Sequence, residues 1–446
     1  MTDPANGKAR RKVLIVSLHF APVNAPDMQR TRMALPHLRA SGWEPVVLAV
    51  DPGSVEGPVL EPRLEKTYPS DIKVVRVRGF PYRISRLLGV GSLWLRCGRA
   101  IRNEGDRLLA EGGFDLVFFS TTQFDAFTLG PRWTSMFGVP YVLDYQDPWE
   151  NDYYARTGTR PPGGWLKFGY SQWTARRREP KALRGASGVV TVSLAYGATL
   201  AAKYAWFDAG LVTFLPFGAS VSDFSVAKTS RPEQPLVNFD DGLVHLVYAG
   251  RCGPDMSVSL KIVFRAFKIF LATNRPEAER IRFHFIGTDY APRPLGREWA
   301  MPVAREEHIE QYVEEHCYRV PYFDALYYLT NADSLLAVGS NDPTYSASKI
   351  FPYVLAGRPM LVVFHEESPV LAMAVSMKCG DRYSFKNADD IDGVAARVAD
   401  EWFLAGAMNL MPKPDVTAFE PFSAATMTRQ LAASFDAAVE RGRPAT

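Results

Sequence analysis

The sequence predicts an α/β protein of two successive doubly wound domains, each a Rossmann-like parallel sheet covered by helices, facing each other across a cleft. A chain of 446 residues is too long for one core. Short apolar runs of strand length alternate with helical stretches in two consecutive series. A polar, proline-bearing stretch separates the two series. We therefore expect domains at 1–225 and 242–415, a linker at 226–241, and a C-terminal helix within 416–446 that can pack back on the first domain.

The first domain is predicted to begin with a buried strand. Basic residues from Lys8 to Lys12, followed by an apolar run at 13–16, imitate a signal peptide, but the run is short and continues into His19 and Pro22. A helix from about residue 28 to 40 follows and ends at Gly42. Continuous apolar runs predict the strands of this sheet at 12–18, 45–50, 74–77, 114–120, 139–149, 187–193 and 213–218.

The second domain repeats this alternation. Its predicted strands lie at 244–249, 281–286, 317–320, 334–338 and 360–364, and a helix at 424–439 closes the chain. The carboxyl ends of parallel strands meet at one edge, where α/β sheets bind ligands, so the polar residues after the strands are the candidate site residues. In the first domain, Asn24-Ala25-Pro26 occupy the loop where a closely bound phosphate would favour glycine. The indication of a nucleotide is therefore weak at that edge.

Composition and motifs exclude several functional classes. A net charge of +3 is small for a general nucleic-acid binder, and the four cysteines lie far apart, as suits a reducing cytosol. The seven histidines show no metal-binding spacing, and the sequence has no Walker loop, nucleophile elbow or dinucleotide fingerprint. No stretch approaches the ~18 apolar residues of a membrane-spanning helix. We expect no metal, no cofactor, no nucleic-acid partner and a cytoplasmic location.

A stretch at 342–363 has the layout of an anion site. A loop of small residues leads into a helix start that carries Lys349, and Gly357-Arg358-Pro359 then turn into an apolar strand. Free backbone N–H groups and the helix dipole favour a phosphate at such a helix start. An ordinary helix N-terminus with a surface lysine is the alternative. Arg251, which follows the first strand of the same domain, is a second cation for a diphosphate.

The segment 76–110 is strongly basic. It holds eight arginines against Glu104 and Asp106, and aromatic and leucine residues lie between them. A basic amphipathic helix of this kind can lie on an anionic membrane surface. Alternatively, its apolar face covers the sheet and its arginines are solvated, and the sequence alone does not separate the two.

Several segments together resemble bacterial GT-B-fold glycosyltransferases of the retaining, family-4-like branch that assembles cell-surface polysaccharides. They are His19-Phe20-Ala21-Pro22 with Arg30, and 42–48, 139–149, 190–193, 248–250, 348–351 and 356–359. The resemblance implies that the second domain binds a UDP- or GDP-linked sugar and that the first binds a lipid-linked or glycan acceptor, without a metal. With the basic segment 76–110, we expect a peripheral enzyme at the inner face of the membrane.

The resemblance implies roles for individual residues as well. Arg251 and Lys349 would neutralise the diphosphate leaving group, and Asp147 would face the acceptor as a catalytic residue. The donor-binding residues would be Gly250, Gly287, Val320, Tyr322, Tyr345, Ser346, Ala347 and Ser348. The acceptor-binding residues would be Asn24, Arg30, Thr121 and Thr122.

Two departures from the family pattern favour a second hypothesis. Pro352 stands where the family commonly has a glutamate that binds the nucleotide ribose, and Met256 stands where a lysine is usual. A catalytically silent GT-B protein that serves as a binding or scaffolding partner is therefore the alternative. A nucleotide-sugar epimerase on a similar fold would need paired acidic catalytic residues that the sequence does not reveal.

Overall fold

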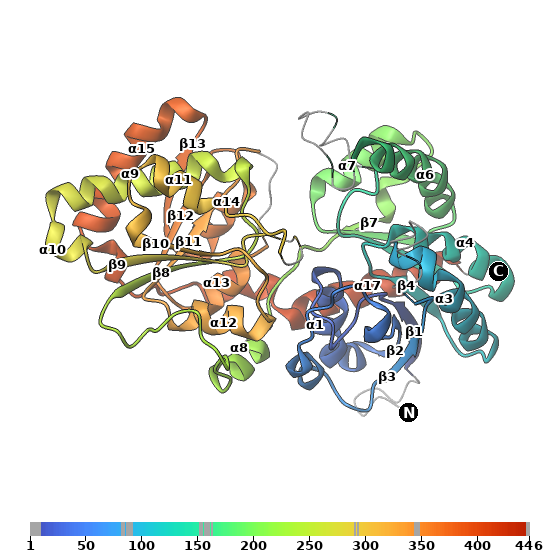
Figure 1. The fold of residues 1–446 in the computed structure, drawn as a ribbon. Helices are drawn as coiled ribbons and strands as arrows, with labels where there is room; N and C mark the ends of the chain where they lie inside the picture. Colours follow the sequence, from blue (N-terminus) through green and yellow to red (C-terminus); the bar gives the residue numbers. More distant parts are fainter. Residues whose placement is uncertain are drawn as a thin grey trace. The chain divides into compact units, whose positions relative to one another are not determined.

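A computed structural model describes residues 10–81, 85, 92–150, 155, 161, 164–289, 291, 294–342 and 348–442. Its chain forms two compact units, one of Met1–Phe217 together with Ala424–Thr446 and one of Gly218–Ser423. In each unit, helices cover a sheet whose strands are all parallel (Figure 1). The predicted fold class, two doubly wound parallel-sheet domains, is thereby confirmed.

The first unit is built on a seven-stranded sheet of order β3-β2-β1-β4-β5-β6-β7. Its strands are β1 (Arg11–Val16), β2 (Trp43–Val50), β3 (Lys73–Val77), β4 (Leu116–Phe119), β5 (Tyr141–Tyr145), β6 (Gly188–Thr191) and β7 (Val212–Phe214). Its helices are α1 (Gln29–Leu38), α3 (Leu93–Ala110), α4 (Leu129–Phe137), α6 (Gly164–Arg184), α7 (Leu194–Lys203) and α17 (Ala424–Gly442). Strand β4 is apolar throughout, and β1 is apolar after Lys12, because both faces of the sheet are covered.

Helix α17 returns from the end of the chain to close one face of this sheet. Its Phe435 is fully buried, with ring centroids 5.3 Å from Trp43 and 5.0 Å from Phe118. On the other face, Phe119 stacks on Trp133 of α4 at 5.6 Å. Burial of such aromatic surface is the main source of stability for an α/β layer, so the last helix is an integral part of the first unit.

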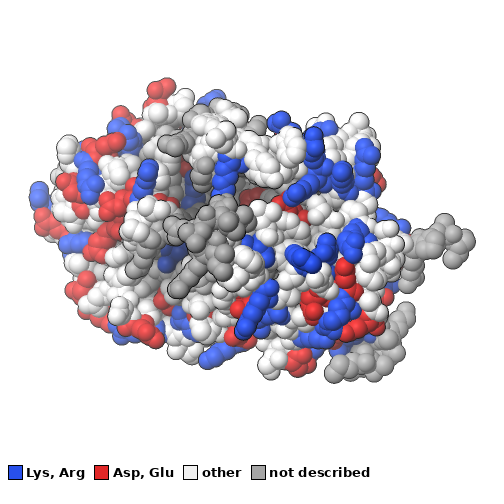
Figure 2. All heavy atoms as spheres, turned by 45° about the vertical axis from the view of Figure 1, so that its right-hand side comes forward, with Lys and Arg blue, Asp and Glu red and all other residues white. Residues whose placement is uncertain are grey.

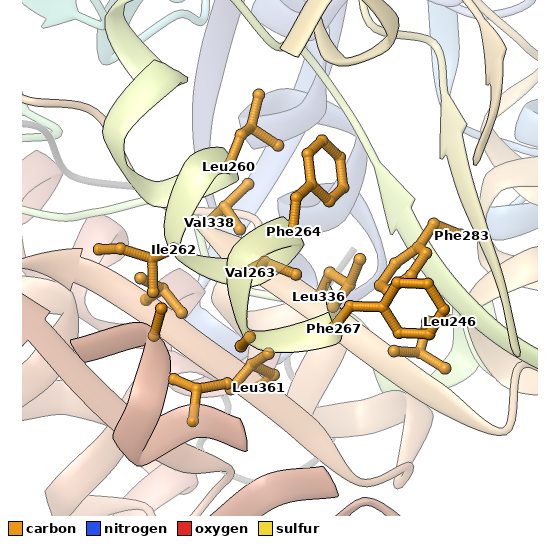
Figure 3. Packing of buried hydrophobic residues seen from close by; sticks show 14 of the residues in the cluster. Leu246, Leu260, Ile262, Val263, Phe264, Phe267, Phe283, Leu336, Val338 and Leu361 are labelled. Atoms are coloured by element: carbon orange, nitrogen blue, oxygen red, sulfur yellow. The ribbon is translucent and has the colours of Figure 1, made fainter. Parts of the chain in front are cut away.

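The second unit contains a six-stranded sheet of order β10-β9-β8-β11-β12-β13. Its strands are β8 (Val244–Ala249), β9 (Ile281–Ile286), β10 (Val313–His316), β11 (Ser334–Val338), β12 (Met360–His365) and β13 (Asp381–Phe385). Its helices are α8 (Val221–Lys228), α9 (Ser257–Thr273), α10 (Arg275–Ala278), α11 (Ala300–Glu306), α12 (Tyr322–Asn331), α13 (Ile350–Ala356), α14 (Pro369–Ser376), α15 (Ile391–Val398) and α16 (Val416–Phe419). Figure 3 shows α9 against the sheet, with Phe264 and Phe267 beside Phe283, Leu336 and Leu246.

The unit boundary lies a few residues before the expected one. The first unit ends at Phe217 rather than at 225, because α8 packs with the second unit. Asp223 of α8 is buried and accepts a hydrogen bond of 2.8 Å from the Tyr322 hydroxyl of α12. The sequence signal of the boundary was the polar stretch that follows α8, and that stretch runs over the surface of the second unit.

The predicted strand at 317–320 is wrong, since β10 spans Val313–His316. Its polar residues concealed it. Glu315 accepts hydrogen bonds from the backbone N–H groups of Trp299, Ala300 and Met301, at 2.9, 2.9 and 2.8 Å. The carboxylate of this strand residue therefore caps the N-terminus of α11, because it accepts hydrogen bonds from N–H groups that have no acceptor within the helix.

Of the two alternatives for the basic segment 76–110, the described part has its apolar face in the core. Helix α3 buries Leu93, Cys97 and Ile101 against the sheet, and even Arg96 is buried and donates to the Ser54 carbonyl at 2.7 Å. Residues 82–84 and 86–91 of the segment lie outside the described residues.

Candidate active site

In the second unit, two side chains of the α13 region form hydrogen bonds with residues at the end of β8. Lys349, which caps α13, donates through Nζ to the Tyr248 hydroxyl and, at 3.3 Å, to the Arg251 carbonyl. Tyr353, one turn later, accepts from the Ala249 N–H at 2.8 Å and donates to the Ala249 carbonyl at 3.0 Å. The structure thus brings Arg251 and Lys349 to the same sheet edge.

The Lys349 side chain is half-buried, and its amine lies against the end of β8. It lies 4.2 Å from the centroid of the Tyr248 ring, and both of its recorded hydrogen-bond acceptors are neutral oxygens. Burial lowers the pKa of Lys349 to about 7, and the positive charge of Arg251 also lowers it. Cys252 and Asp255 have the opposite effect on this pKa. Among the described residues, the hydrogen-bond acceptors of this amine carry no formal charge, so a diphosphate bound here would supply a counter-charge.

Arg251 is held in a bidentate pair with Asp255. The two guanidinium N–H···O distances are 2.9 and 2.8 Å, and the arginine side chain is one third exposed. Gly253 makes room for this pair, because a Cβ there would lie 2.5 Å from the Asp255 carboxylate and 2.7 Å from the guanidinium. Sequence reasoning missed Asp255, although a carboxylate four residues after an arginine at a turn is a visible signal.

The other expected donor-site residues are distributed differently. Gly250, with φ of 135°, lies directly beside Lys349, and a Cβ there would meet Nζ at 3.5 Å. Gly287 ends β9 with φ of 72°, and its N–H donates to the His316 carbonyl. The Tyr322 hydroxyl donates to Asp223, so it serves the packing of α8. Val320 is half-buried and Ser348 exposed, whereas Tyr345, Ser346 and Ala347 lie outside the described residues.

Both departures from the family pattern have a structural account. Pro352 is the third residue of α13, within the first turn, where a missing N–H breaks no helical bond. Met256 is fully buried, and its sulfur lies 3.5 Å from the Tyr248 hydroxyl. It packs against Tyr248, the tyrosine to which Lys349 donates, and so fills the position of the usual lysine with an apolar side chain.

In the first unit, Asp27 bonds to several residues at the carboxyl-end edge of the sheet. It is 3% exposed, and both its carboxylate oxygens lie 3.0 Å from His19 Nδ1. One oxygen also accepts from the hydroxyls of Thr121 and Thr122 and from the Thr122 N–H, each at 3.2 Å. Burial alone would raise the pKa of Asp27, but His19 and these donors outweigh it and hold that pKa below its ordinary value. Thr121 and Thr122 therefore position Asp27.

A second buried carboxylate, Asp144, holds Arg30. The Arg30 Nε donates to Asp144 Oδ2 at 2.8 Å, and its terminal nitrogen donates to the Leu215 carbonyl at 2.7 Å. The same oxygen of Asp144 accepts from Ser120 and Gln146, each at 2.9 Å. Arg30 is only 5% exposed, so it ties β5 to the end of the sheet rather than reaching into solvent.

Asp147 and Asn24 complete the residues expected at this edge. Asp147 is exposed, and partial loss of hydration, together with the nearby Asp27 charge, raises its pKa to about 6. Asn24 is 6% exposed, and its backbone N–H donates to the Val59 carbonyl. Asp147 is thus the accessible carboxylate of the group. His19 was not expected to contribute, although its position directly after the first strand was the available signal.

Within the described ranges, no helix has both the length and the hydropathy to cross a bilayer. No cluster of three or more His, Cys, Asp or Glu side chains among those same residues has the geometry to hold a metal ion.

Comparison with known proteins gives one family match. Residues 29–218 match a family model described as glycosyl transferase 4-like domain. No curated protein matches the chain.

Solved structures are similar over nearly the whole chain. HepE from Anabaena, determined with UDP and with UDP-glucose, has 14% identity and a TM-score of 0.56 over 95% of this chain and 99% of that one. The UDP-forming α,α-trehalose-phosphate synthase of Burkholderia vietnamiensis has 12% identity and a TM-score of 0.57 over 96% and 97%. A Listeria monocytogenes protein assigned as UDP-N-acetylglucosamine 2-epimerase has 12% identity and a TM-score of 0.52 over 96% of each chain. At these identities the likeness shows the fold.

Proposed function

We propose that this chain transfers a sugar from a UDP- or GDP-linked donor to a lipid-linked or glycan acceptor in cell-surface polysaccharide synthesis. The match of residues 29–218 to the glycosyl transferase 4-like domain, together with the GT-B fold, supports this proposal. The observation that carries the donor half is the position of the Lys349 amine, which lies at the end of β8 beside Arg251 and donates to neutral oxygens. HepE, on the same fold, was determined with UDP-glucose, which supports UDP as the first nucleotide to test.

The proposed chemistry is stabilisation of the departing diphosphate. Lys349 supplies one positive charge, and Arg251 a second one once its guanidinium turns from Asp255 toward the phosphates. Charged hydrogen bonds aimed at a leaving group in a site of low dielectric are among the strongest catalytic contributions. Gly250 leaves the approach to Lys349 open, because it carries no side chain. We also propose that catalysis needs no metal, and sugar transfer is therefore expected to persist in the presence of EDTA.

Calorimetry with UDP and GDP tests the donor site. Lys349→Met is expected to lower nucleotide affinity by about tenfold to a hundredfold, the range for a lost hydrogen bond to a charged group. Lys386→Met is the matched control, since Lys386 is a well-exposed lysine of the same unit. Absence of affinity for either nucleotide, or equal affinity in both variants, contradicts the donor assignment.

The acceptor half rests on the carboxyl edge of the first unit. Asp147, as the exposed carboxylate there, would hydrogen-bond an acceptor hydroxyl. Retention of the anomeric configuration follows from the family resemblance. One observation favours inversion instead, because His19 backed by Asp27 is arranged like a general base. The anomeric configuration of the product, measured by NMR, separates the two outcomes.

The silent scaffold remains the second candidate because of Pro352. Without a glutamate at that position, the ribose has to be held by other groups, and a protein that lacks them would bind a nucleotide poorly and turn over nothing. Release of UDP from UDP-glucose by the purified chain, with or without acceptor, excludes the scaffold. Nucleotide binding with no turnover across acceptors favours it.

A further inference from the structure

None of the residues in the first three turns of α6 is buried in the first unit. Every residue from Gly164 to Thr174 is exposed or half-buried, and the anchoring side chains begin only at Ala175. Helical stability in proteins comes mostly from packing one face against the body of the molecule. Among the described residues, none of the side chains in these turns is buried, so a surface outside the unit would account for their apolar composition.

The exposed side chains form an apolar, mostly aromatic stripe. Leu166, Tyr170 and Trp173 follow one another at intervals of four and three residues, which puts them on one face, and they are 93%, 62% and 50% exposed. Trp165 adds a 48% exposed indole beside them. The Tyr170 and Trp173 rings stack with centroids 6.0 Å apart. These four residues are called the α6 patch.

Positive charge surrounds the α6 patch. The helix carries six Lys and Arg residues and one carboxylate, Glu179, which is buried and hydrogen-bonded to Tyr204 at 2.8 Å. The Arg177 guanidinium lies 4.2 Å from the centroid of the Trp173 ring, so charge and aromatic surface are directly adjacent. Figure 2 shows Lys and Arg gathered at the upper right of the view, the region of α6 and α7 in Figure 1, with few Asp or Glu among them.

We propose that the α6 patch docks the protein on an anionic lipid bilayer. Trp and Tyr favour the interface between headgroups and acyl chains, and flanking Lys and Arg are attracted to anionic headgroups. A second copy of the chain is a poorer partner, because a symmetric contact would bring two equally cationic helices together. Helix α3 cannot offer a comparable face, since its apolar side is buried in the core. The inference rests on the proposed function only in that a lipid-linked acceptor would be met at this surface.

Vesicle flotation of the full chain tests the proposal, with phosphatidylcholine vesicles and with vesicles that also contain phosphatidylglycerol. The wild type is expected to float with the anionic vesicles and much less with the neutral ones. Leu166→Ser with Trp173→Ser removes apolar contact, and Arg177→Gln with Lys181→Gln removes two charges. Each pair is expected to lower the bound fraction about tenfold or more. Val375→Ser with Leu410→Ser is the matched control, at residues 57% and 69% exposed in the second unit.

Three results would overturn the proposal. They are a wild type that stays unbound with anionic vesicles, patch variants that float as well as the control, and a dimer in solution that the patch variants abolish without any flotation. UDP-glucose affinity is measured on the same samples, because it depends on the second unit. Flotation without nucleotide binding removes the proposed function and keeps the docking surface, and nucleotide binding without flotation does the reverse.

Discussion

His19 and Asp27 form a buried pair at the carboxyl edge of the first sheet. His19 Nδ1 lies 3.0 Å from both carboxylate oxygens, and the imidazole keeps 18% of its surface exposed. The pKa of Asp27 is held below its ordinary value, so the carboxylate accepts and Nδ1 carries the proton. In the neutral imidazole this leaves the lone pair on Nε2, which makes His19 able to accept a proton or hydrogen bond from an acceptor hydroxyl.

Asp27→Asn is expected to slow sugar transfer by about a hundredfold, since an amide can donate to Nδ1 and reverse the tautomer of His19. UDP-glucose affinity should stay within about twofold of wild type, because the proposed donor site lies in the second unit. Acceptor-dependent kcat/KM and calorimetry on the same preparation make the measurement. Asp125→Asn, at a partly exposed carboxylate that pairs with Arg178, is the control. An unchanged transfer rate would show that the pair is only structural.

The affinity for UDP-glucose is expected to fall as pH rises from 6 to 8.5. In the free protein the pKa of Lys349 is about 7, so the amine is mostly neutral above that pH and binding a diphosphate must recruit a proton. UDP-glucose is the suitable ligand because its diester phosphates do not titrate in this range. Calorimetry in buffers of different ionisation enthalpy should reveal proton uptake above pH 7. Lys349→Met should bind weakly with no pH dependence, and a pH-independent wild type would contradict the assignment.

The sequence was sufficient for features that depend on local pattern. Apolar runs predicted most strands, and the lysine at the start of α13 was found together with Arg251 because both follow strands of one sheet. What it missed depends on partners distant in sequence. Asp27 takes its role from Thr121 and His19, and β10 was hidden because Glu315 caps a helix fifteen residues earlier. No single-residue pattern reports such pairings, since the same side chains in isolation resemble solvated surface.

The sequence left the role of the segment 76–110 undecided for a related reason. The segment 76–110 and α6 are both rich in aromatic and leucine residues. Most apolar side chains of α3 enter the core, although Leu95 is exposed, whereas Leu166 and Trp173 in the first three turns of α6 remain exposed. Hydrophobic spacing identifies an apolar face but does not tell whether the sheet or an outside surface covers it. Only the tertiary structure distinguishes the two helices.

The second unit is expected to lose stability as pH falls from 6.5 toward 3. His284 is 2% exposed, and its pKa is lowered to about 3, chiefly by burial and then by the charges of His245 and His316. The charge of Asp241 acts on this pKa in the opposite direction. The unfolded chain binds a proton near pH 6.5 that the folded unit excludes, so the loss grows below that pH. Between pH 7 and 5 it amounts to about 2 kcal/mol.

Urea unfolding at pH 7 and pH 5, followed by a signal from the second unit, measures this loss. His284→Gln should reduce the difference between the two pH values, whatever its effect on absolute stability. His308→Asn is the control, because His308 is exposed and asparagine tolerates its positive φ of 57°. An equal pH dependence in His284→Gln and wild type would assign the loss to other groups.

The last helix should be required for the first unit and not for the second. Phe435→Ala removes a fully buried ring from between Trp43 and Phe118, a change that typically costs about 3–5 kcal/mol. Hydrogen exchange should show reduced protection in β1, β2 and β4, with β8 to β13 unchanged, because the second unit has its own core. Leu410→Ala, at a residue 69% exposed, should leave protection unchanged in both units. Equal loss of protection across the two sheets would mean that they unfold as one cooperative body despite their separate cores.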